Sequence, residues 1–291
     1  MIKYSLLTFL LLFIGYEIIV RSTDIYWTIG QNQWQSNIMR ANTLIYDGGR
    51  YDNIMVGSSI ANKLSAKISR DSLPESFYNL SFDGQSSFDG LRILENLNYK
   101  PKRLFIEMNI ISREEDKNFT GALFSPVLFP AKKYFKSLRE NYQPVEVIAR
   151  MKNRRKMHLD SLAKEPVAKF ERDESTFQHF LKVRTQDNKQ LLTAEKVRTQ
   201  IGRLKEIVSR FQQKGVQVVF FEVPVDPLVC DLPLPVQIRS ALEENFEPMG
   251  CKFIRIPDCS GYYTSDVTHL ERGSVYRYLR YFRNELDRQH I

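Results

Sequence analysis

The sequence predicts an α/β fold, a three-layer α/β/α sandwich in which helices cover both faces of a five-stranded, mostly parallel sheet. Five short apolar segments are typical of buried strands, and segments with helical spacing separate them along the chain. Neighbouring parallel strands need crossover connections, which such helices supply. The expected strands are residues 52–57, 76–82, 102–112, 216–225 and 251–257.

The expected helices alternate with these strands. The clearest is residues 194–215, a long amphipathic segment that Gly215 closes at its C-terminal end. Residues 113–192 interrupt the alternation, because they contain prolines and mixed charges but no clear strand. We therefore expect an α/β domain over residues 51–291 with a mostly helical insertion at about 113–192. The remaining helices are expected at 59–69, 86–98, 235–250 and 271–289.

Residues 1–23 predict an N-terminal transmembrane helix. Lys3 precedes an apolar run at residues 4–20, which reaches roughly 25 Å as a helix, near the short end for a membrane span. No small-x-small cleavage site follows the run, which favours an uncleaved anchor over a signal peptide. Glu17 lies one turn before Arg21, and this spacing predicts an ion pair at the membrane interface.

The anchor also predicts where the rest of the chain lies. Residues 24–50 are expected as a linker, and no second apolar span follows them. Short anchors with a basic N-terminus often export the segment behind them, so residues 51–291 are expected outside the cytoplasm, on the periplasmic or cell-surface side. The opposite orientation stays open, because Arg21 on the far side weakens the charge bias.

The charge of the chain indicates which kinds of partner it could bind. The net charge of +8 favours anionic partners such as lipid headgroups, acidic polymers or nucleic acid, and it does not choose among them. The basic stretch at 150–156 suits lipid phosphates, an acidic glycan or simply a solvated helix face, and the aromatic segment 124–138 suits a lid, a membrane contact or a partner helix. Aromatic residues do not interleave with the basic stretch as in nucleic-acid-binding proteins, so no nucleic acid is expected.

The chain has three cysteines, Cys230, Cys251 and Cys259, so at most one disulfide can form. Their spacing fits no zinc motif.

A glycine and two serines follow the first expected strand. In an open parallel sheet, ligands bind beyond the carboxyl ends of the strands, where the following helices point their free N–H groups. Gly57 would permit a tight turn there, and Ser59 would face a partly positive helix end that stabilises an oxyanion. The simpler interpretation of this stretch alone is that Ser58 or Ser59 is an N-cap.

Three other strand ends supply what a serine nucleophile needs. His269 follows the last strand, and Asp266, three residues earlier, can orient one imidazole nitrogen while the other takes the serine proton. Gly84 after the second strand and Asn109 after the third are candidate oxyanion donors. Each alone has an ordinary structural explanation, as a turn glycine or a loop polar residue. Together they occur in the chain order of an acyl-transfer site.

These motifs resemble the SGNH, or GDSL-type, hydrolase and acyltransferase superfamily. "GSS" matches the serine block with Ser59 as nucleophile, Gly84 matches the oxyanion glycine, and D-x-x-H matches Asp266 and His269. Asn109 matches the third block less closely, because the usual G-x-N-D run is absent, and Leu270 replaces the proline that follows the family's histidine. The resemblance covers residues from about 51 to 112 and 194 to 285, and it implies a flavodoxin-like sheet and no metal or organic cofactor.

The combination of "GSS" with a single N-terminal anchor is more similar to the membrane-tethered branch of this superfamily. That branch includes the D-alanyl transfer protein of teichoic-acid modification and acetylation proteins for exported polysaccharides. The resemblance implies an acyl donor, a polysaccharide acceptor and a membrane-bound O-acyltransferase as partner. Two alternatives stay open at this point. One is a non-catalytic assembly protein that binds a cell-envelope glycan, and the other is a lipid esterase.

Overall fold

The computed structural model describes residues 2–22, 32–64, 73, 77–145, 172–256 and 258–291. The chain divides into two compact units, Met1–Gly49 with Lys117–Pro166 and Arg50–Asp116 with Val167–Ile291. The expected strands and every candidate site residue belong to the second unit. The basic stretch at 150–156 lies outside the described residues.

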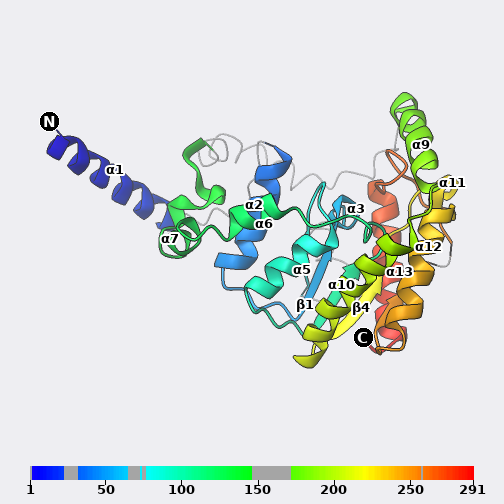
Figure 1. Cartoon of the computed structure of the whole chain (residues 1–291). Coiled ribbons are helices and arrows are strands. Elements are labelled where there is room, and N and C mark those ends of the chain that lie inside the picture. The colour runs from blue at the N-terminus through cyan, green and yellow to red at the C-terminus, as the bar shows by residue number, and fades with distance from the viewer. Residues whose placement is uncertain (1, 23–31, 65–72, 74–76, 146–171, 257) are drawn as a thin grey trace. The chain divides into compact units, whose positions relative to one another are not determined.

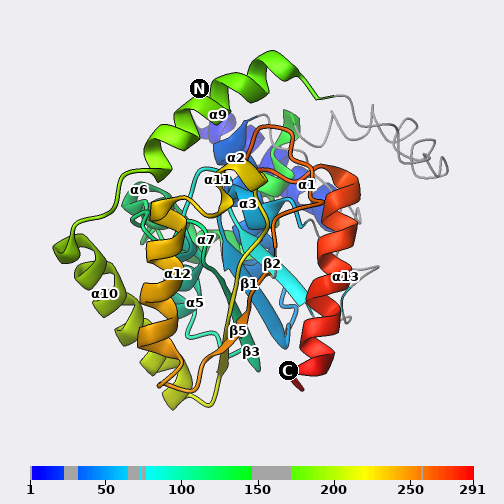
Figure 2. The same ribbon diagram turned by 90° about the vertical axis from the view of Figure 1, so that its right-hand side faces the viewer.

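The second unit contains a five-stranded sheet in the order β2-β1-β3-β4-β5, with every neighbouring pair parallel. This is the flavodoxin-like strand order. Figure 2 shows α13 on one face of the sheet and α5, α10 and α12 on the other, so the predicted three-layer α/β architecture is confirmed. The strands are β1 (Asn53–Gly57), β2 (Phe77–Ser81), β3 (Arg103–Glu107), β4 (Gln217–Phe221) and β5 (Lys252–Ile254). The helices are α3 (Ser59–Asn62), α5 (Ser87–Asn96), α9 (Glu174–Asn188), α10 (Ala194–Gln213), α11 (Pro227–Cys230), α12 (Pro233–Phe246) and α13 (Arg272–Arg288).

Alternate residues of β4 build the cores on the two faces. The ring of Phe220 lies 4.9 Å from that of Phe246 on α12, whereas the ring of the next residue, Phe221, lies 5.7 Å from that of Phe282 on α13. Successive side chains of a strand point to opposite faces of the sheet. Because helices cover both faces, Phe220 and Phe221 are both fully buried. The sequence of such a strand, which is buried on both faces of a parallel sheet, is therefore a continuous apolar run.

The strands are shorter in the structure than expected, and β3 and β4 differ most at their C-terminal ends. β3 ends at Glu107 instead of residue 112, because the chain turns there and the N–H groups of Ile111 and Arg113 donate to carbonyls three residues earlier. β4 likewise ends at Phe221 instead of residue 225. Of the helix expected at 59–69, Ser59–Asn62 is helical and residues 65–69 lie outside the described part. The early strand ends leave irregular segments beyond the sheet edge, where the candidate site lies.

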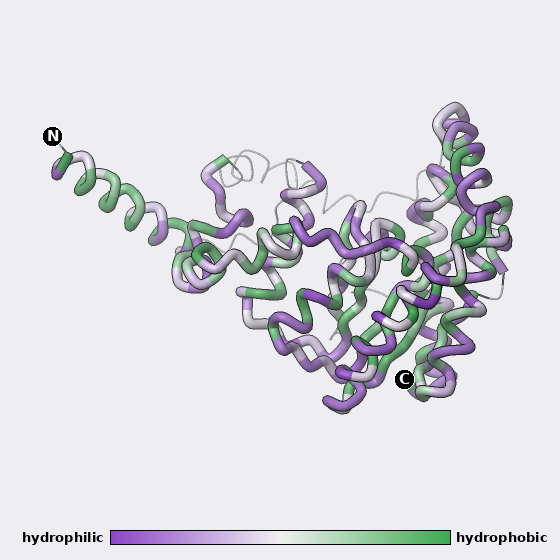
Figure 3. Tube along the Cα trace, viewed as in Figure 1, coloured by the Kyte–Doolittle hydropathy of each residue, from purple (hydrophilic) through white to green (hydrophobic). Residues whose placement is uncertain are grey.

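The described residues of the first unit are mainly helical (Figure 1). Within the described residues these are α1 (Ile2–Ser22), α2 (Gln33–Tyr46), α6 (Lys117–Leu123), α7 (Leu128–Tyr134) and the short 3-10 turns η1 (Lys136–Leu138) and η2 (Glu140–Tyr142). α1 is apolar along most of its length (Figure 3), and it is long and apolar enough to cross a membrane, a property that secretory signal sequences share. The predicted Glu17–Arg21 ion pair is confirmed at 2.6 Å.

Residues 33–46 differ from the expected linker, because they form α2. Its polar side chains find partners about 100 residues away: Asn42 Nδ2 donates to Glu140 Oε2 at 2.7 Å. Glu140 also accepts from Lys132 Nζ at 2.6 Å, and Lys132 is 4% exposed. A buried ammonium needs such a carboxylate, so this network holds α2 against η2 and α7. A polar segment of this kind looks like a linker until its partners are known.

Candidate active site

The two serines after β1 have different roles. Ser58 is the N-cap of α3, with extended backbone and an Oγ that accepts from the N–H of Ile60 at 3.1 Å. Ser59 is the first helical residue, and its Oγ lies 2.9 Å from Nε2 of His269. The capping interpretation therefore applies to Ser58 and leaves the hydroxyl of Ser59 available to an imidazole.

His269 joins Ser59 to Asp266. Its Nδ1 lies 2.6 Å from Oδ2 of Asp266, while Oδ1 of the same carboxylate accepts from the N–H of His269 at 2.9 Å. An ionised carboxylate only accepts hydrogen bonds, so Nδ1 carries the imidazole proton and Nε2 has the lone pair that faces the serine hydroxyl. The structure thus brings together the three residues predicted as nucleophile, base and orienting acid.

The loop that carries this pair has a left-handed residue at its centre. Val267 has φ 75°, a conformation that costs a β-branched residue on the order of 1–3 kcal/mol. Its side chain is fully buried, and its carbonyl accepts from the N–H of Asp226 at 2.8 Å. The N–H of Ser265 donates to the carbonyl of His269 at 2.8 Å and closes the loop. Burial and these hydrogen bonds hold the loop in the strained conformation that presents His269.

The surroundings of Asp266 favour its ionised form. Burial raises the pKa of its carboxyl, but the side-chain and backbone hydrogen bonds from His269 outweigh burial and hold the pKa well below its usual range. The charge of Asp266 can therefore stabilise the imidazolium that forms when His269 takes a proton.

A second carboxylate, Glu107, lies directly behind the serines and was not among the predicted site residues. It ends β3 and is fully buried, and its two oxygens accept from the N–H of Ser58 at 2.6 Å and from Ser58 Oγ at 3.0 Å. Gly57 is glycine for the same reason: a Cβ there would lie 2.4 Å from Oε2 of Glu107 and 2.8 Å from Cβ of Ala61. The structure thus adds a reason for glycine at 57 that the sequence analysis did not give, namely the close approach of Glu107. The available signal was a lone acid inside an apolar strand segment.

Glu107 is expected to make the stability of the protein depend on pH. Burial raises its pKa from 4.5 to about 7, although hydrogen bonds from Ser58 oppose the shift. Because the pKa of Glu107 is higher in the folded state than in the unfolded state, its contribution to the free energy of unfolding is fully present below pH 4.5. This contribution is lost as the pH rises through about 7, and the total change is about 3 kcal/mol. Between pH 4.5 and about 7, the free energy of unfolding of wild type is expected to fall by this amount relative to that of Glu107→Gln. Denaturant unfolding at several pH values measures the difference. A difference between the two proteins that does not vary with pH would contradict it.

Asn109 lies at the carboxyl end of β3, where the sequence predicted it, but its amide is already engaged. Nδ2 donates to the carbonyl of Val223 at 2.9 Å, and Oδ1 accepts from the N–H of Val223 at 2.9 Å. The side chain therefore links the segments that follow β3 and β4. This contact gives Asn109 a structural role that the oxyanion-donor prediction did not include.

Gly84 lies in the exposed turn after β2, with φ 74°, a conformation that favours glycine. The neighbouring Asp83 accepts from Nδ2 of Asn62 at 2.7 Å, which ties this turn to the end of α3, the helix that begins with Ser59. The turn of the predicted oxyanion glycine and the helix of the predicted nucleophile are thus connected directly.

A pocket of about 240 Å³ opens beside Ser59 and His269, and all its lining residues belong to the second unit. One part of its wall is apolar, which suits an acyl chain or the carbon skeleton of a substrate. Among these apolar residues are Ile110, Val225, Val229, Leu234 and Ile238.

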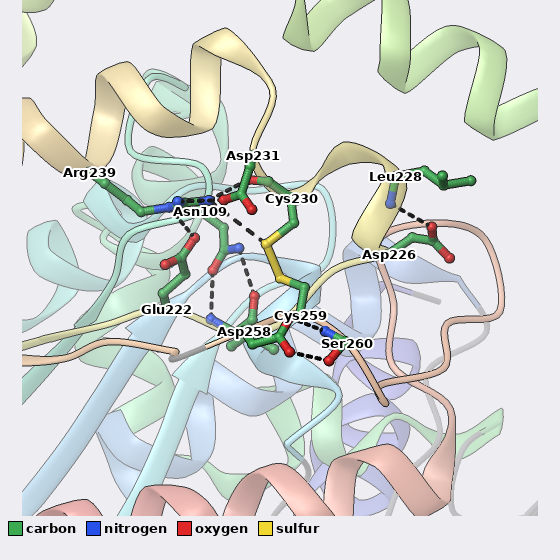
Figure 4. Close-up of a disulfide and its surroundings, with 11 residues drawn as sticks. Asn109, Glu222, Asp226, Leu228, Cys230, Asp231, Arg239, Asp258, Cys259 and Ser260 are labelled. Carbon is green, nitrogen blue, oxygen red and sulfur yellow. Dashed lines mark hydrogen bonds and ion pairs between the residues drawn. A yellow bond between two sulfur atoms is a disulfide. The ribbon is translucent and has the colours of Figure 1, made fainter.

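One cysteine that lines this pocket, Cys230, belongs to a disulfide. The disulfide joins Cys230, at the end of α11, to Cys259, in the segment after β5 (Figure 4). Cys251 is free and buried. Beside the disulfide, Arg239 pairs with Glu222 at 3.0 Å and with Asp231 at 2.9 Å. The sequence predicted at most one bridge, and the structure identifies the pair.

In the described part of the chain, no cluster of three or more His, Cys, Asp or Glu side chains could hold a metal ion.

Comparisons with known proteins find similarity only at the level of solved structures. No protein-family model matches the chain, and no curated protein matches its sequence. A Bacteroides fragilis protein described as a "putative acylhydrolase" is similar in structure with a TM-score of 0.46 and 10% sequence identity, over 89% of this chain and 99% of that one. A GDSL-like lipase from Bacteroides thetaiotaomicron is similar with a TM-score of 0.45 and 10% identity, over 88% of this chain and 99% of that one.

Proposed function

We propose that this protein is a serine acyltransferase or esterase of the SGNH type. The observation that carries the proposal is the continuous contact from Ser59 Oγ to His269 Nε2 at 2.9 Å and from His269 Nδ1 to Asp266 at 2.6 Å. A serine hydroxyl is a weak nucleophile unless a positioned base takes its proton. The triad meets this requirement at the edge of a parallel sheet, beside a pocket.

The chemistry would proceed in two steps. Ser59 Oγ attacks an acyl carbonyl while His269 takes the hydroxyl proton, and the resulting oxyanion accepts from the N–H of Ser59, which as the first helical residue has no intrahelical acceptor, and from the N–H of Gly84. His269 then gives its proton to the leaving group, and an acyl-Ser59 ester remains. In the second step an acceptor hydroxyl or water attacks that ester and loses its proton to His269. His269 gives this proton to Ser59 Oγ as the ester bond breaks, which releases the acylated acceptor or the free acid and restores the serine hydroxyl.

We propose further that the acceptor is a cell-surface or exported polysaccharide, that the acyl group is O-acetyl or similar, and that the domain works outside the cytoplasm beside a membrane-bound O-acyltransferase. The resemblance to the tethered branch of the superfamily motivates this proposal. Two structural features are consistent with it: α1 can serve as an anchor, and the Cys230–Cys259 disulfide suits an oxidising compartment.

Covalent labelling tests the activated serine directly. The full-length protein, in non-ionic detergent and in native membranes, is treated with a fluorophosphonate and analysed by peptide mass spectrometry. We expect an adduct on Ser59 that is absent from Ser59→Ala and His269→Ala and that persists in His179→Ala, a control histidine on α9. Folded wild type without an adduct in either setting would contradict the proposal.

A further inference from the structure

The pocket beside Ser59 contains an excess of positive charge. Three arginines line it: Arg113, Arg184 and Arg239. Arg239 is neutralised within the chain, because its guanidinium pairs with both Glu222 and Asp231 and donates to the carbonyl of Cys230. The other two arginines are not neutralised in this way.

Arg113 follows β3 and is half-buried. Its Nη1 donates to the carbonyl of Gln85 at 3.1 Å, but within the described residues no carboxylate lies close enough to form an ion pair with it. Burial lowers the pKa of this guanidinium, and the charge of Arg184 lowers it further, while the more distant charges of Glu107 and Asp89 act in the opposite direction. The two arginines therefore repel one another across the pocket.

Arg184 comes from α9, which also contributes Asp187 to the pocket wall. The nearest oxygen of Asp187 is 3.9 Å from Arg184 Nη1, at the limit of an ion pair, and the Asp187 side chain is 57% exposed. A contact of this kind is worth little. The Nε of Arg184 is buried and has no hydrogen-bond partner within the described structure. A buried donor without an acceptor costs free energy that a bound anion would recover.

We propose that Arg113 and Arg184 form an anion subsite that binds a carboxylate or phosphate group of the substrate while its acyl or hydroxyl group lies at Ser59. Guanidinium groups offer paired N–H donors that match the oxygens of either anion. The subsite rests on the proposed function for its catalytic meaning, and it narrows the substrate to one that carries an acidic group. The chain's net charge of +8 would attract such a substrate.

Calorimetric titration of the full-length protein in non-ionic detergent tests the subsite without using activity. Glucuronate represents the carboxylate source and glycerol 3-phosphate the phosphate source, while glucose and glycerol are their neutral partners. Sodium chloride keeps the ionic strength constant, because screening alone weakens charge interactions. We expect at least one anion to bind and neither neutral partner to do so, and the preferred anion identifies the source.

The variants locate the binding. Arg113→Gln and Arg184→Gln should each weaken anion binding by about 10-fold or more, because each loses a charge-assisted hydrogen bond. Arg198→Gln on α10, an exposed arginine outside the pocket, should leave binding unchanged, and Asp187→Asn should strengthen it. Circular dichroism checks that each variant is folded.

Failure of the subsite can be told apart from failure of the proposed function. A protein whose Ser59 is labelled by the fluorophosphonate but which binds neither anion, or binds them equally well in both arginine variants, overturns the subsite alone. A protein that binds an anion through Arg113 and Arg184 but whose Ser59 is never labelled keeps the subsite and loses the catalytic assignment.

Discussion

Ser59→Ala and His269→Ala are each expected to lower kcat/KM for an ester such as 4-nitrophenyl acetate by about 10⁴- to 10⁶-fold. Under the proposed function, alanine at 59 removes the attacking oxygen, and alanine at 269 removes the base whose Nε2 lies 2.9 Å from that oxygen. Because these residues act as one unit, the double variant should be no slower than the worse single variant. Steady-state kinetics of the full-length protein in non-ionic detergent measure this.

Asp266→Asn and Ser58→Ala separate the roles within the site. Asparagine at 266 presents a neutral amide to the imidazole, so its loss should also be large, on the order of 10⁴-fold. Ser58→Ala removes the α3 cap, which costs about 1 kcal/mol of stability, but keeps the nucleophile. If Ser58→Ala abolished turnover while Ser59→Ala retained it, the assignment of nucleophile and cap would be reversed.

Loss of the disulfide is expected to have the largest effect on stability. The bridge joins residues 29 positions apart, and closing a loop of this size stabilises the folded state by about 3.5 kcal/mol in the chain-entropy description. For a unit of this size, the double variant Cys230→Ala with Cys259→Ala should unfold about 10 °C lower than wild type. Thermal unfolding followed by far-UV circular dichroism measures the shift.

Cys251 provides the matched control for the disulfide. It is buried and unpaired, and burial raises the pKa of its thiol to about 11, so it stays protonated and unreactive near neutral pH. Reductant should lower the unfolding temperature of wild type and of Cys251→Ala, but not that of the double variant. Equal sensitivity to reductant in all three proteins would show that the bridge contributes nothing.

The fold and the proximity of Ser59 to His269 could be predicted from sequence because each signal lies within a short segment of the chain. Buried strands such as β4 are continuous apolar runs, and the long helix α10 has its own periodicity and terminal glycine. Ser59 and His269 are far apart in the chain, but each directly follows an expected strand, and parallel strands end at one edge of the sheet. Position along the pattern was therefore enough to bring them together.

The features that sequence could not supply depend on partners that only the fold selects. Glu107 is a lone acid in an apolar segment until the fold places it against Ser58, 49 residues away. Three cysteines allow three pairings, and no local pattern chooses Cys230 with Cys259. α2 looks like a polar linker because the acid that holds it, Glu140, is 98 residues distant. In each case a tertiary contact, and not a local conformational preference, determines the structure.

The contact between Ser59 and His269 spans 210 positions of the chain. A ribosome makes the strand and helix that carry the serine long before it makes the loop that carries the base, so a nascent chain would have a hydroxyl with no means of activation. Catalytic competence would then arise only after the last strand has joined the sheet. Under the proposed function, the appearance of fluorophosphonate reactivity during refolding would report completion of the whole α/β unit, and not the formation of any one part.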